Sequence, residues 1–331
     1  MEDWASLEIA PWRKRRLHRS DLRAALDEAA LSDPAVCLFR IHDGIVSVAR
    51  LHGDDLPGEQ LPVVAARVSL IGDFLQAVVA EHRIDCDILL GICLRDRAPD
   101  QRQAPLFCFH KVRFDQAILL PDLDFMISAF YAGDEFRDPL AFADKRPEAF
   151  FVGATTGGMV TIDRLRAGGH ERIRAAGFFR DKPGVTFEIS SIVQCDGEET
   201  RAEVERRVPL SAGWRSWQEQ FAYRYLLSMD GNGATWARTA IALASNSVLV
   251  KYASPSLLYY MHGLEPWVHF LPVRRDSDVL DIIANAERTL ERDADIAQAG
   301  RAFAARHFTR EAVTGYTAEL LRLYASAVRT S

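Results

Sequence analysis

The sequence is poor in cysteine and lacks the motifs of several common enzyme classes. Its five cysteines form no Cys-x-x-Cys pair, so neither a zinc site nor a disulfide framework is predicted, and a reducing compartment is expected. The chain contains no Walker motif, no GxGxxG, no GxSxG and no HExxH. These absences argue against a P-loop nucleotide hydrolase, a serine hydrolase, a zinc protease and a nucleotide-dependent oxidoreductase.

The sequence also lacks an overall positive charge. Its formal net charge is −6 and its pI is about 5.9, so no nucleic-acid partner is predicted. The exception is the segment from Arg13 to Arg19, which carries five positive charges and is either a solvated face or a peripheral contact with anionic lipid. No basic leader precedes an apolar stretch, and no run of about 18 apolar residues stands out. We therefore expect a cytoplasmic protein, with peripheral attachment to the inner membrane as an option.

What the chain does contain is an alternation of strand-like and helix-like segments. Residues 20–31 and 68–84 have the helical period, a hairpin is predicted around Asp43-Gly44, and residues 87–94 form an apolar strand. The alternation continues after residue 149, which predicts an α/β protein built on parallel sheets. The predicted domains are an N-terminal αβ half over residues 1–145, a Rossmann-like half over residues 146–305, and a C-terminal helix over residues 306–331 that packs back on the first half.

A polar loop between two apolar segments allows two interpretations. The stretch DGNGATWAR, residues 230–238, follows the strand-like YLLSM and precedes the apolar AIALASNSVLVKY. Its Asn-Gly dipeptide is typical of a hairpin turn. Its glycines, Arg238 and the helical period that follows are typical of a loop that binds an anion through backbone amides and a guanidinium. Spacing alone leaves the two interpretations about even.

Other loops carry weaker signals. Residues 153–158, GATTGG, follow the apolar FFV and form either a structural turn or a phosphate-binding loop, with the turn favoured. Two Asp-x-Asp pairs, Asp85 with Asp87 and Asp122 with Asp124, border strand-like runs. Such pairs can hold a divalent cation, but the pattern is common, and no metal site is predicted.

Several segments, in this order, resemble glycosyltransferase family 90, and in particular its bacterial branch. They are RYLLSMDGNGATWAR, LASNSVLVK, GLEPWVHFLPV, DVLDIIANAE and AQAGRAFAARHF, while AILLPDLDFM and AFFVGATTGG resemble the central part of the family. The resemblance implies a GT-B architecture, in which two Rossmann-like halves face a cleft. It also implies an inverting transfer of a hexose or pentose from a UDP-sugar, with no required metal or other cofactor.

The resemblance gives the loops specific roles. It implies that Arg238 stabilises the charge that develops on the leaving UDP, and that both glycine loops line the donor pocket. The expected donor-binding residues are Arg238, Asp230, Gly231, Asn232, Gly233, Ala234, Gly153, Ala154, Thr155 and Thr156.

The acceptor side is less complete. Inversion needs a general base near the acceptor hydroxyl, and the candidates are Asp134, which we favour, Asp124 and Asp122. Animal members of the family have a longer segment before the glycine loop and an arginine within it, both of which this chain lacks. The implied acceptor is a lipopolysaccharide, another bacterial surface glycan or a glycolipid. The alternative is a GT-B-like protein that binds nucleotide, or assembles with a partner, without turnover.

Overall fold

The computed structural model describes residues 3–15, 17–51, 56, 58, 60–96, 103–213 and 215–329. The chain forms two compact units, and each has its own five-stranded β-sheet. Unit 1 comprises Met1–Phe130, Pro255–Gly263 and His307–Ser331, and unit 2 comprises Tyr131–Ser254 and Leu264–Arg306. Each unit is therefore built from segments that are separated in the chain, and neither unit is one continuous stretch.

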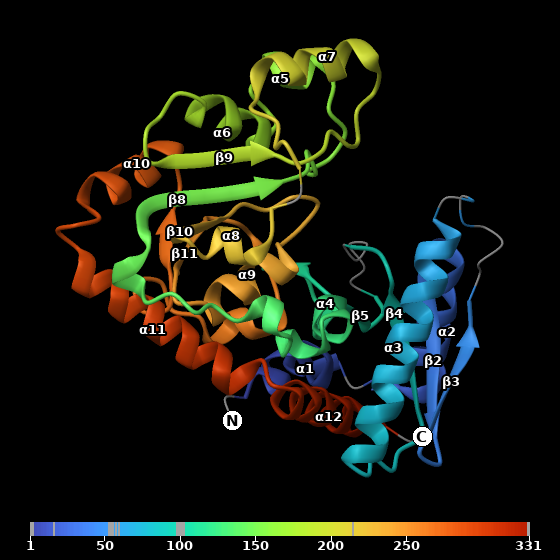
Figure 1. The fold of residues 1–331 in the computed structure, drawn as a ribbon. Helices are drawn as coiled ribbons and strands as arrows, with labels where there is room; N and C mark the ends of the chain where they lie inside the picture. Colours follow the sequence, from blue (N-terminus) through green and yellow to red (C-terminus); the bar gives the residue numbers. More distant parts are fainter. Residues whose placement is uncertain are drawn as a thin grey trace. The chain divides into compact units, whose positions relative to one another are not determined.

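Unit 1 contains a mixed sheet with the strand order β3-β2-β4-β5-β7 (Figure 1). Strand β2 is antiparallel to both of its neighbours, whereas β4, β5 and β7 run parallel. The predicted hairpin at Asp43-Gly44 is present, with both residues at positive φ. Because this hairpin pairs β2 with β3, the expectation of a parallel first sheet is wrong for these strands. The elements of unit 1 are α1 (Trp4–Arg15), α2 (Arg19–Ser32), α3 (Leu61–Glu81), α4 (Leu123–Ile127), α12 (Arg310–Ala327), β1 (Leu17–His18), β2 (Val36–His42), β3 (Ile45–Arg50), β4 (Ile88–Cys93), β5 (Leu106–Cys108), β6 (Lys111–Val112), β7 (Ile118–Leu119), β12 (Ser256–Leu257) and β14 (Val328–Arg329).

The C-terminal helix α12 packs within unit 1 against α1 and α3. Two of its tyrosines reach the backbone of the sheet: the Tyr316 hydroxyl donates to the Leu119 carbonyl at 2.8 Å, and that of Tyr324 to the Leu89 carbonyl at 3.1 Å. Both hydroxyls are thereby satisfied in the core, where an unpaired polar group would be costly.

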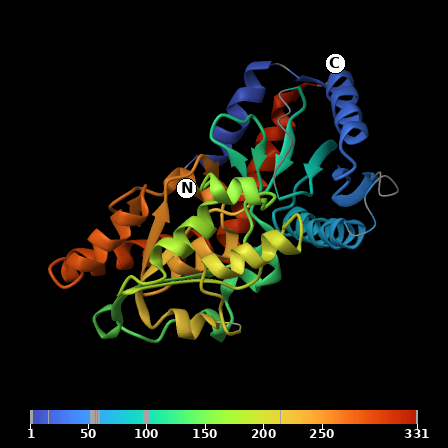
Figure 2. The same cartoon turned by 90° about the horizontal axis from the view of Figure 1, so that it is seen from above.

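Helix α3 is long and apolar enough to cross a membrane by length and composition alone, with a mean hydropathy of 1.7 over its best window. This corrects the expectation that no segment of the chain reaches that composition. A core helix of a soluble protein passes the same test. Here α3, light blue in Figures 1 and 2, lies against β3. Its buried side chains are Val64, Ile71, Phe74, Leu75, Val78 and Val79.

The basic segment lies at the end of α1 and the start of α2. Arg13 and Lys14 are exposed, and the Arg15 guanidinium lies 4.9 Å from the centre of the Trp12 ring. Arg19 donates to the Asp87 carbonyl at 2.9 Å and pairs with the Asp87 carboxylate. Arg16 lies outside the described residues.

Unit 2 contains a wholly parallel sheet with the strand order β9-β8-β10-β11-β13. Five of the six residues of β10 are buried, as expected for a central strand covered on both faces. The elements of unit 2 are α5 (Ile162–Arg166), α6 (Glu171–Phe179), α7 (Glu198–Arg207), α8 (Trp217–Gln220), α9 (Trp236–Ala244), α10 (Asp276–Asn285), α11 (Leu290–His307), β8 (Arg146–Gly153), β9 (Val185–Ile189), β10 (Tyr223–Ser228), β11 (Val248–Tyr252) and β13 (Leu271–Val273).

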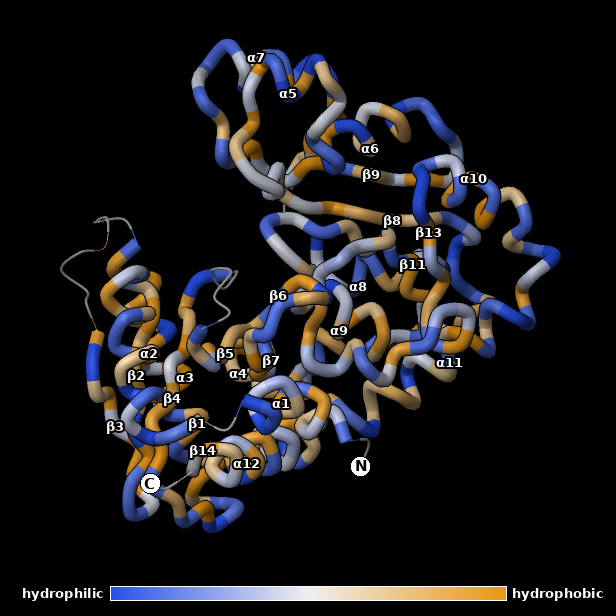
Figure 3. The backbone as a smooth tube through the Cα atoms, turned by 180° about the vertical axis from the view of Figure 1, so that it is seen from behind, coloured by the Kyte–Doolittle hydropathy of each residue, from blue (hydrophilic) through white to orange (hydrophobic). Residues whose placement is uncertain are grey.

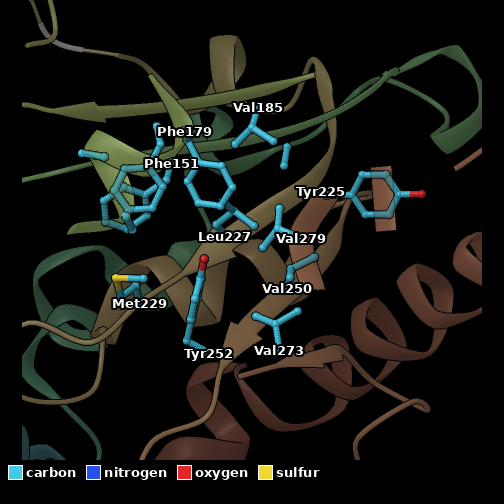
Figure 4. Close-up of a cluster of buried hydrophobic side chains, with 14 of the residues drawn as sticks. Phe151, Phe179, Val185, Tyr225, Leu227, Met229, Val250, Tyr252, Val273 and Val279 are labelled. Carbon is cyan, nitrogen blue, oxygen red and sulfur yellow. The ribbon is translucent and has the colours of Figure 1, made fainter. Parts of the chain in front are cut away.

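One hydrophobic core joins the strands of unit 2 to the helices on the same face. Phe151 of β8 stacks on Phe187 of β9 with ring centres 4.2 Å apart, and Phe179 of α6 lies against Phe187. Figure 4 shows this cluster continuing along β10 and β11, and Figure 3 shows the hydrophobic colouring of β8. The predicted α/β class, with two halves and a helical C-terminal segment, is confirmed by the two units.

Candidate functional site

The strand order of unit 2 identifies one place where loops can converge on a ligand. Strand β8 is followed in the chain by β9 on one side, whereas β10 and β11 extend the sheet on the other. In open parallel sheets of this type, ligands bind beyond the carboxyl ends of the strands at this switch point, here between β8 and β10. The two glycine loops of the sequence, residues 153–158 and 230–234, follow these two strands.

The structure excludes the hairpin interpretation of the second loop, while its anion-binding role stays a prediction. β10 and β11 are parallel, and α9 connects them, so the chain does not turn directly back after the loop. Thr235 stands at the N-cap of α9, but its hydroxyl contacts those of Ser228 and Thr239 and does not cap the helix. The N-terminus of α9 lies at the carboxyl edge of the sheet, where helix N-termini attract anions.

The first glycine loop is fixed by hydrogen bonds of one of its own side chains to a neighbouring segment of backbone. The buried Thr155 hydroxyl donates to the Val193 carbonyl and accepts from the Val193 amide, both at 2.8 Å. Gly157 and Gly158 have φ of +130° and +94°, a backbone conformation that other residues rarely adopt. The Thr155 hydroxyl therefore supports the loop, and the donor-binding role of Thr155 stays a prediction.

The two loops contact each other directly. The Gly157 amide donates to the Asn232 side-chain oxygen at 3.1 Å. Gly231 packs so closely on the first loop that a Cβ there would lie 2.2 Å from the Thr156 hydroxyl oxygen. The Gly231 amide donates to the Gly233 carbonyl at 3.0 Å, and Ala234 is buried. The structure thus brings the predicted donor-binding residues together as one paired loop.

The Asp230 carboxylate is hydrogen-bonded to residues in and just after β11, the next strand in the chain. It accepts hydrogen bonds from the Ser254 hydroxyl and from Lys251 Nζ, the latter at 3.3 Å. Lys251 is the fourth residue of β11 and is 8% exposed. The Asp230 side chain therefore orients Lys251 and Ser254 at the carboxyl edge, and sequence spacing gave no sign of this pairing.

Arg172 is a second residue that the sequence did not single out. It lies in the first turn of α6, is 7% exposed, and hydrogen-bonds to both glycine loops. Burial lowers its pKa to about 10, an effect that the charge of Asp230 opposes. A helix that connects two parallel strands begins at the carboxyl edge of the sheet, which explains why α6 delivers this side chain to the site. Its acceptors are the carbonyls of Ala154, Met229 and Asp230 and the hydroxyl of Thr156.

Arg238 lies in the first turn of α9, as predicted, but its side chain points toward the end of β8, where the first loop begins. It donates to the Val152 carbonyl at the end of β8 and to Gln220 Oε1 at 3.1 Å. The guanidinium carbon lies 4.9 Å from the centre of the Phe151 ring and 5.5 Å from that of Trp217. Burial, followed by repulsion from Arg172, lowers its pKa to about 9. Arg238 is thus a partly buried cation that has only neutral partners among the described residues.

The three candidate bases have different environments. Asp122 is fully buried, and its Oδ1 caps α4 by accepting from the Asp124 amide. Burial raises its pKa well above the ordinary value, which disfavours the ionised form and makes this buried carboxyl a poor candidate base. Asp124 is partly buried in the first turn of α4. The Asp134 side chain is 94% exposed. Two residues of α8 link the turn that contains Asp134 to Arg238. Gln218 donates to the carbonyl of Glu135, and the Trp217 ring lies over the guanidinium of Arg238.

In the described part of the chain, no group of three or more His, Cys, Asp or Glu residues could hold a metal ion. Asp87 of the first Asp-x-Asp pair is already bound to Arg40 and Arg19, which lowers its pKa. Asp122 of the second pair is fully buried, and its burial disfavours the charged form that a metal ion would need.

Comparison with known sequences gives a family match. The profile described as Glycosyl transferase family 90 matches residues 92–331. Protein O-glucosyltransferase 2 of Danio rerio is 37% identical over 106 residues, which is 32% of this chain and 21% of that protein. Protein O-glucosyltransferase 3 of Homo sapiens is 29% identical over 106 residues, again 32% of this chain and 21% of that protein. The chain spans about a fifth of the length of the curated relatives it matches.

Comparison with solved structures gives weaker likenesses. TarM is 14% identical, with a TM-score of 0.38 over 68% of this chain and 51% of that one. Alr3699/HepE from Anabaena, solved in complex with UDP, is 18% identical, with a TM-score of 0.36 over 55% of this chain and 50% of that one.

Proposed function

The chain belongs to glycosyl transferase family 90, and on this premise we propose that it transfers a hexose or pentose from a UDP-sugar to a hydroxyl group, with inversion at the sugar. The observation that carries the proposal is the charge at the switch point of unit 2. Arg172, Arg238 and Lys251 lie there, and within the described part of the chain the Asp230 carboxylate is the one anion that interacts with them, which leaves two positive charges. The diphosphate of a UDP-sugar is a dianion and matches this excess.

The placement of the two arginines supports an anionic ligand. Each lies in the first turn of a helix, where the macrodipole already contributes positive charge. Both are buried enough to lower their pKa, and Arg172 further lowers that of Arg238. Two cations so placed repel each other, and an anion bound between or beside them offsets this repulsion. We propose that the diphosphate relieves this repulsion, and that the relief grows as UDP leaves and its charge increases.

We propose that the side chains of Arg172 and Arg238 and the N-terminal ends of α6 and α9 provide positive charge to the leaving group. We therefore propose that the transfer proceeds without a required divalent cation. Asp134 is the proposed general base, because its carboxylate is exposed and is connected through α8 to the residues around Arg238. An accessible carboxylate can accept the proton of an acceptor hydroxyl as the bond to the sugar forms.

The acceptor that we propose is a bacterial surface glycan, a lipopolysaccharide or a glycolipid, reached at the cytoplasmic face of the inner membrane. Arg13 and Lys14 support a membrane contact, since both are exposed at the end of α1. Each basic residue near an anionic surface contributes about 1 kcal/mol. Because the names of the animal relatives describe protein O-glucosyltransferases, UDP-glucose is the first donor to test and a protein hydroxyl is a control acceptor.

The donor side is tested by thermal unfolding with UDP in the presence of EDTA. A ligand at a hundredfold excess over its Kd stabilises the folded state by about 2.7 kcal/mol. We expect Arg238→Met, which keeps apolar contact with Phe151 and Trp217, to lose most of this shift. Arg206→Met is the matched control, because Arg206 is exposed on α7 and pairs with Glu203. Absence of a UDP shift at millimolar concentration in the wild-type protein would contradict the proposal.

The second candidate function is nucleotide binding without turnover. The loop sequence Val152-Gly153-Ala154-Thr155, which lacks the arginine of animal members, favours it. Release of UDP from UDP-glucose, UDP-galactose, UDP-xylose and UDP-N-acetylglucosamine, with and without glycan acceptors, separates the two. Binding with no turnover for any donor would favour the non-catalytic function. Turnover that Asp134→Asn abolishes would establish the transferase and its base.

A further inference from the structure

We propose that Arg172 is the positioning residue of the donor site: it clamps the two glycine loops into one binding surface. The inference rests on the proposed function for the identity of the ligand, but the clamp itself is a property of the unliganded chain. No sequence motif marks Arg172, which follows a Gly-Gly-His break between two short helices.

The contacts of Arg172 reach both strand ends. Nη1 donates to the Ala154 carbonyl at 2.9 Å and to the Thr156 hydroxyl at 2.8 Å, both in the first loop. Nη2 donates to the Met229 carbonyl at 2.8 Å and Nε to the Asp230 carbonyl at 3.1 Å, both at the start of the second loop. The planar fork of an arginine can make such divergent bonds at once, whereas the ammonium of a lysine cannot.

The clamp also has an electrostatic role. Carbonyl oxygens at the carboxyl ends of parallel strands carry partial negative charge and would repel a diphosphate. Arg172 engages three of them, so their partial charges are directed at a cation. Its guanidinium carbon lies 5.4 Å from the centre of the Phe151 ring, whose other cationic neighbour is Arg238. The aromatic face thus holds both cations near the loops.

The packing around Gly231 depends on the same side chain. A Cβ at Gly231 would approach Arg172 Nη2 to 3.0 Å and the Thr156 oxygen to 2.2 Å. The second loop therefore rests on the Arg172–Thr156 pair, and losing the guanidinium removes the surface against which Gly231 packs. We infer that Arg172 acts through the loops, and we expect its loss to affect donor affinity more than the chemical step.

The experiment compares Arg172→Met and Arg172→Lys with the wild-type protein and with Arg174→Met. Arg174 lies two residues further along α6, is partly exposed and pairs with Asp276, so it is a matched control outside the loops. Amide hydrogen exchange is measured without ligand over residues 153–158 and 230–234. UDP affinity is measured by calorimetry on the folded fraction. Arg172→Lys serves if Arg172→Met does not fold.

We expect exchange in both loops to rise in Arg172→Met and Arg172→Lys, and the Kd for UDP to rise at least about tenfold, equivalent to 1.4 kcal/mol. In turnover assays KM for the UDP-sugar should rise more than kcat falls. Thr156→Val should weaken UDP binding less in the Arg172→Met background than in the wild type, because the two residues act together.

The outcomes separate the clamp from the proposed function. Unchanged exchange in both loops in the folded variants would overturn the clamp, whatever UDP does. Increased exchange with UDP affinity equal to that of Arg174→Met would overturn its role in donor binding. Increased exchange in a protein whose wild-type form binds no UDP would support the clamp and refute the UDP-sugar assignment.

Discussion

The close contact between the two glycine loops predicts that Gly231→Ala is costly for steric reasons alone. Gly231 has no positive φ, so alanine is compatible with its backbone. The added methyl would lie 2.2 Å from the Thr156 oxygen, 3.0 Å from its Cβ and 3.0 Å from Arg172 Nη2. Overpacking of this kind costs about 1–3 kcal/mol. Any movement of Thr156 also strains its 2.8 Å bond to Arg172, and a hydrogen bond to a charged group contributes about 1.5–3 kcal/mol.

The assay is urea unfolding of Gly231→Ala, Thr156→Gly and the double variant, together with UDP affinity. Thr156→Gly removes both threonine atoms that crowd the new methyl, so the double variant should be more stable than the sum of the two single changes by about 1–2 kcal/mol. Gly315→Ala in α12 is the control, because no atom lies within 4 Å of its Cβ position, and alanine should stabilise that helix by about 0.5–1 kcal/mol. A Gly231→Ala protein with wild-type stability and UDP affinity would refute the description of the paired loops.

Two further predictions concern protonation and backbone strain. His170 caps α6, and its pKa is lowered to about 4, first by burial and then by the charge of Arg164. In the unfolded chain this histidine takes up a proton near pH 6.5, whereas the folded ring stays neutral down to about pH 4. The free energy of unfolding should therefore fall as the pH drops from about 6.5 to 4. His170→Asn, which can still cap the helix, should show a smaller loss over this interval, and an identical slope would refute the assignment. Ala129 has φ of +48° in a left-handed turn that continues through Phe130 and Tyr131, which costs about 1–2 kcal/mol per residue, so Ala129→Gly should raise the melting temperature. If the strain serves the transfer, Ala129→Gly should also lower kcat, whereas the control Asp43→Gly, at φ of +49° in the hairpin, should not.

Local patterns in the sequence were sufficient to predict elements but not their pairing. The loop at residues 230–234 illustrates the difference. Its Asn-Gly dipeptide is compatible with a hairpin, and only the position of α9 between β10 and β11 excludes one. The register of two parallel strands is set by packing on both faces of a sheet, which a short window of sequence does not contain. Conversely, the hairpin at Asp43-Gly44 was predictable, because its turn and both strands are adjacent in the chain.

In the candidate site, too, local features could be predicted from the sequence, whereas contacts between distant elements could not. The two glycine loops were predictable because glycines after apolar strands are a local signal. Arg172 and Lys251 were not, since each reaches the loops from a different element, α6 or β11. The role of Arg238 was predicted only in part. Its place in the first turn of α9 follows from the helical period, but its turn toward the Val152 carbonyl depends on the distant Phe151 and Trp217 rings.

The carboxylates show how burial decides chemistry among residues that look alike in the sequence. Asp122 lies just after β7 in the core, where burial raises its pKa and disfavours the ionised form. Asp134 follows a turn and a glycine, and its side chain is almost fully solvated. A general base must be accessible to the acceptor hydroxyl, and of these two residues only Asp134 has a solvent-exposed carboxyl group. Asp122→Asn should therefore leave turnover intact as long as the protein folds, while Asp134→Asn should abolish it. The reverse result would place the base in unit 1 and would require a mechanism that lowers the pKa of a buried acid.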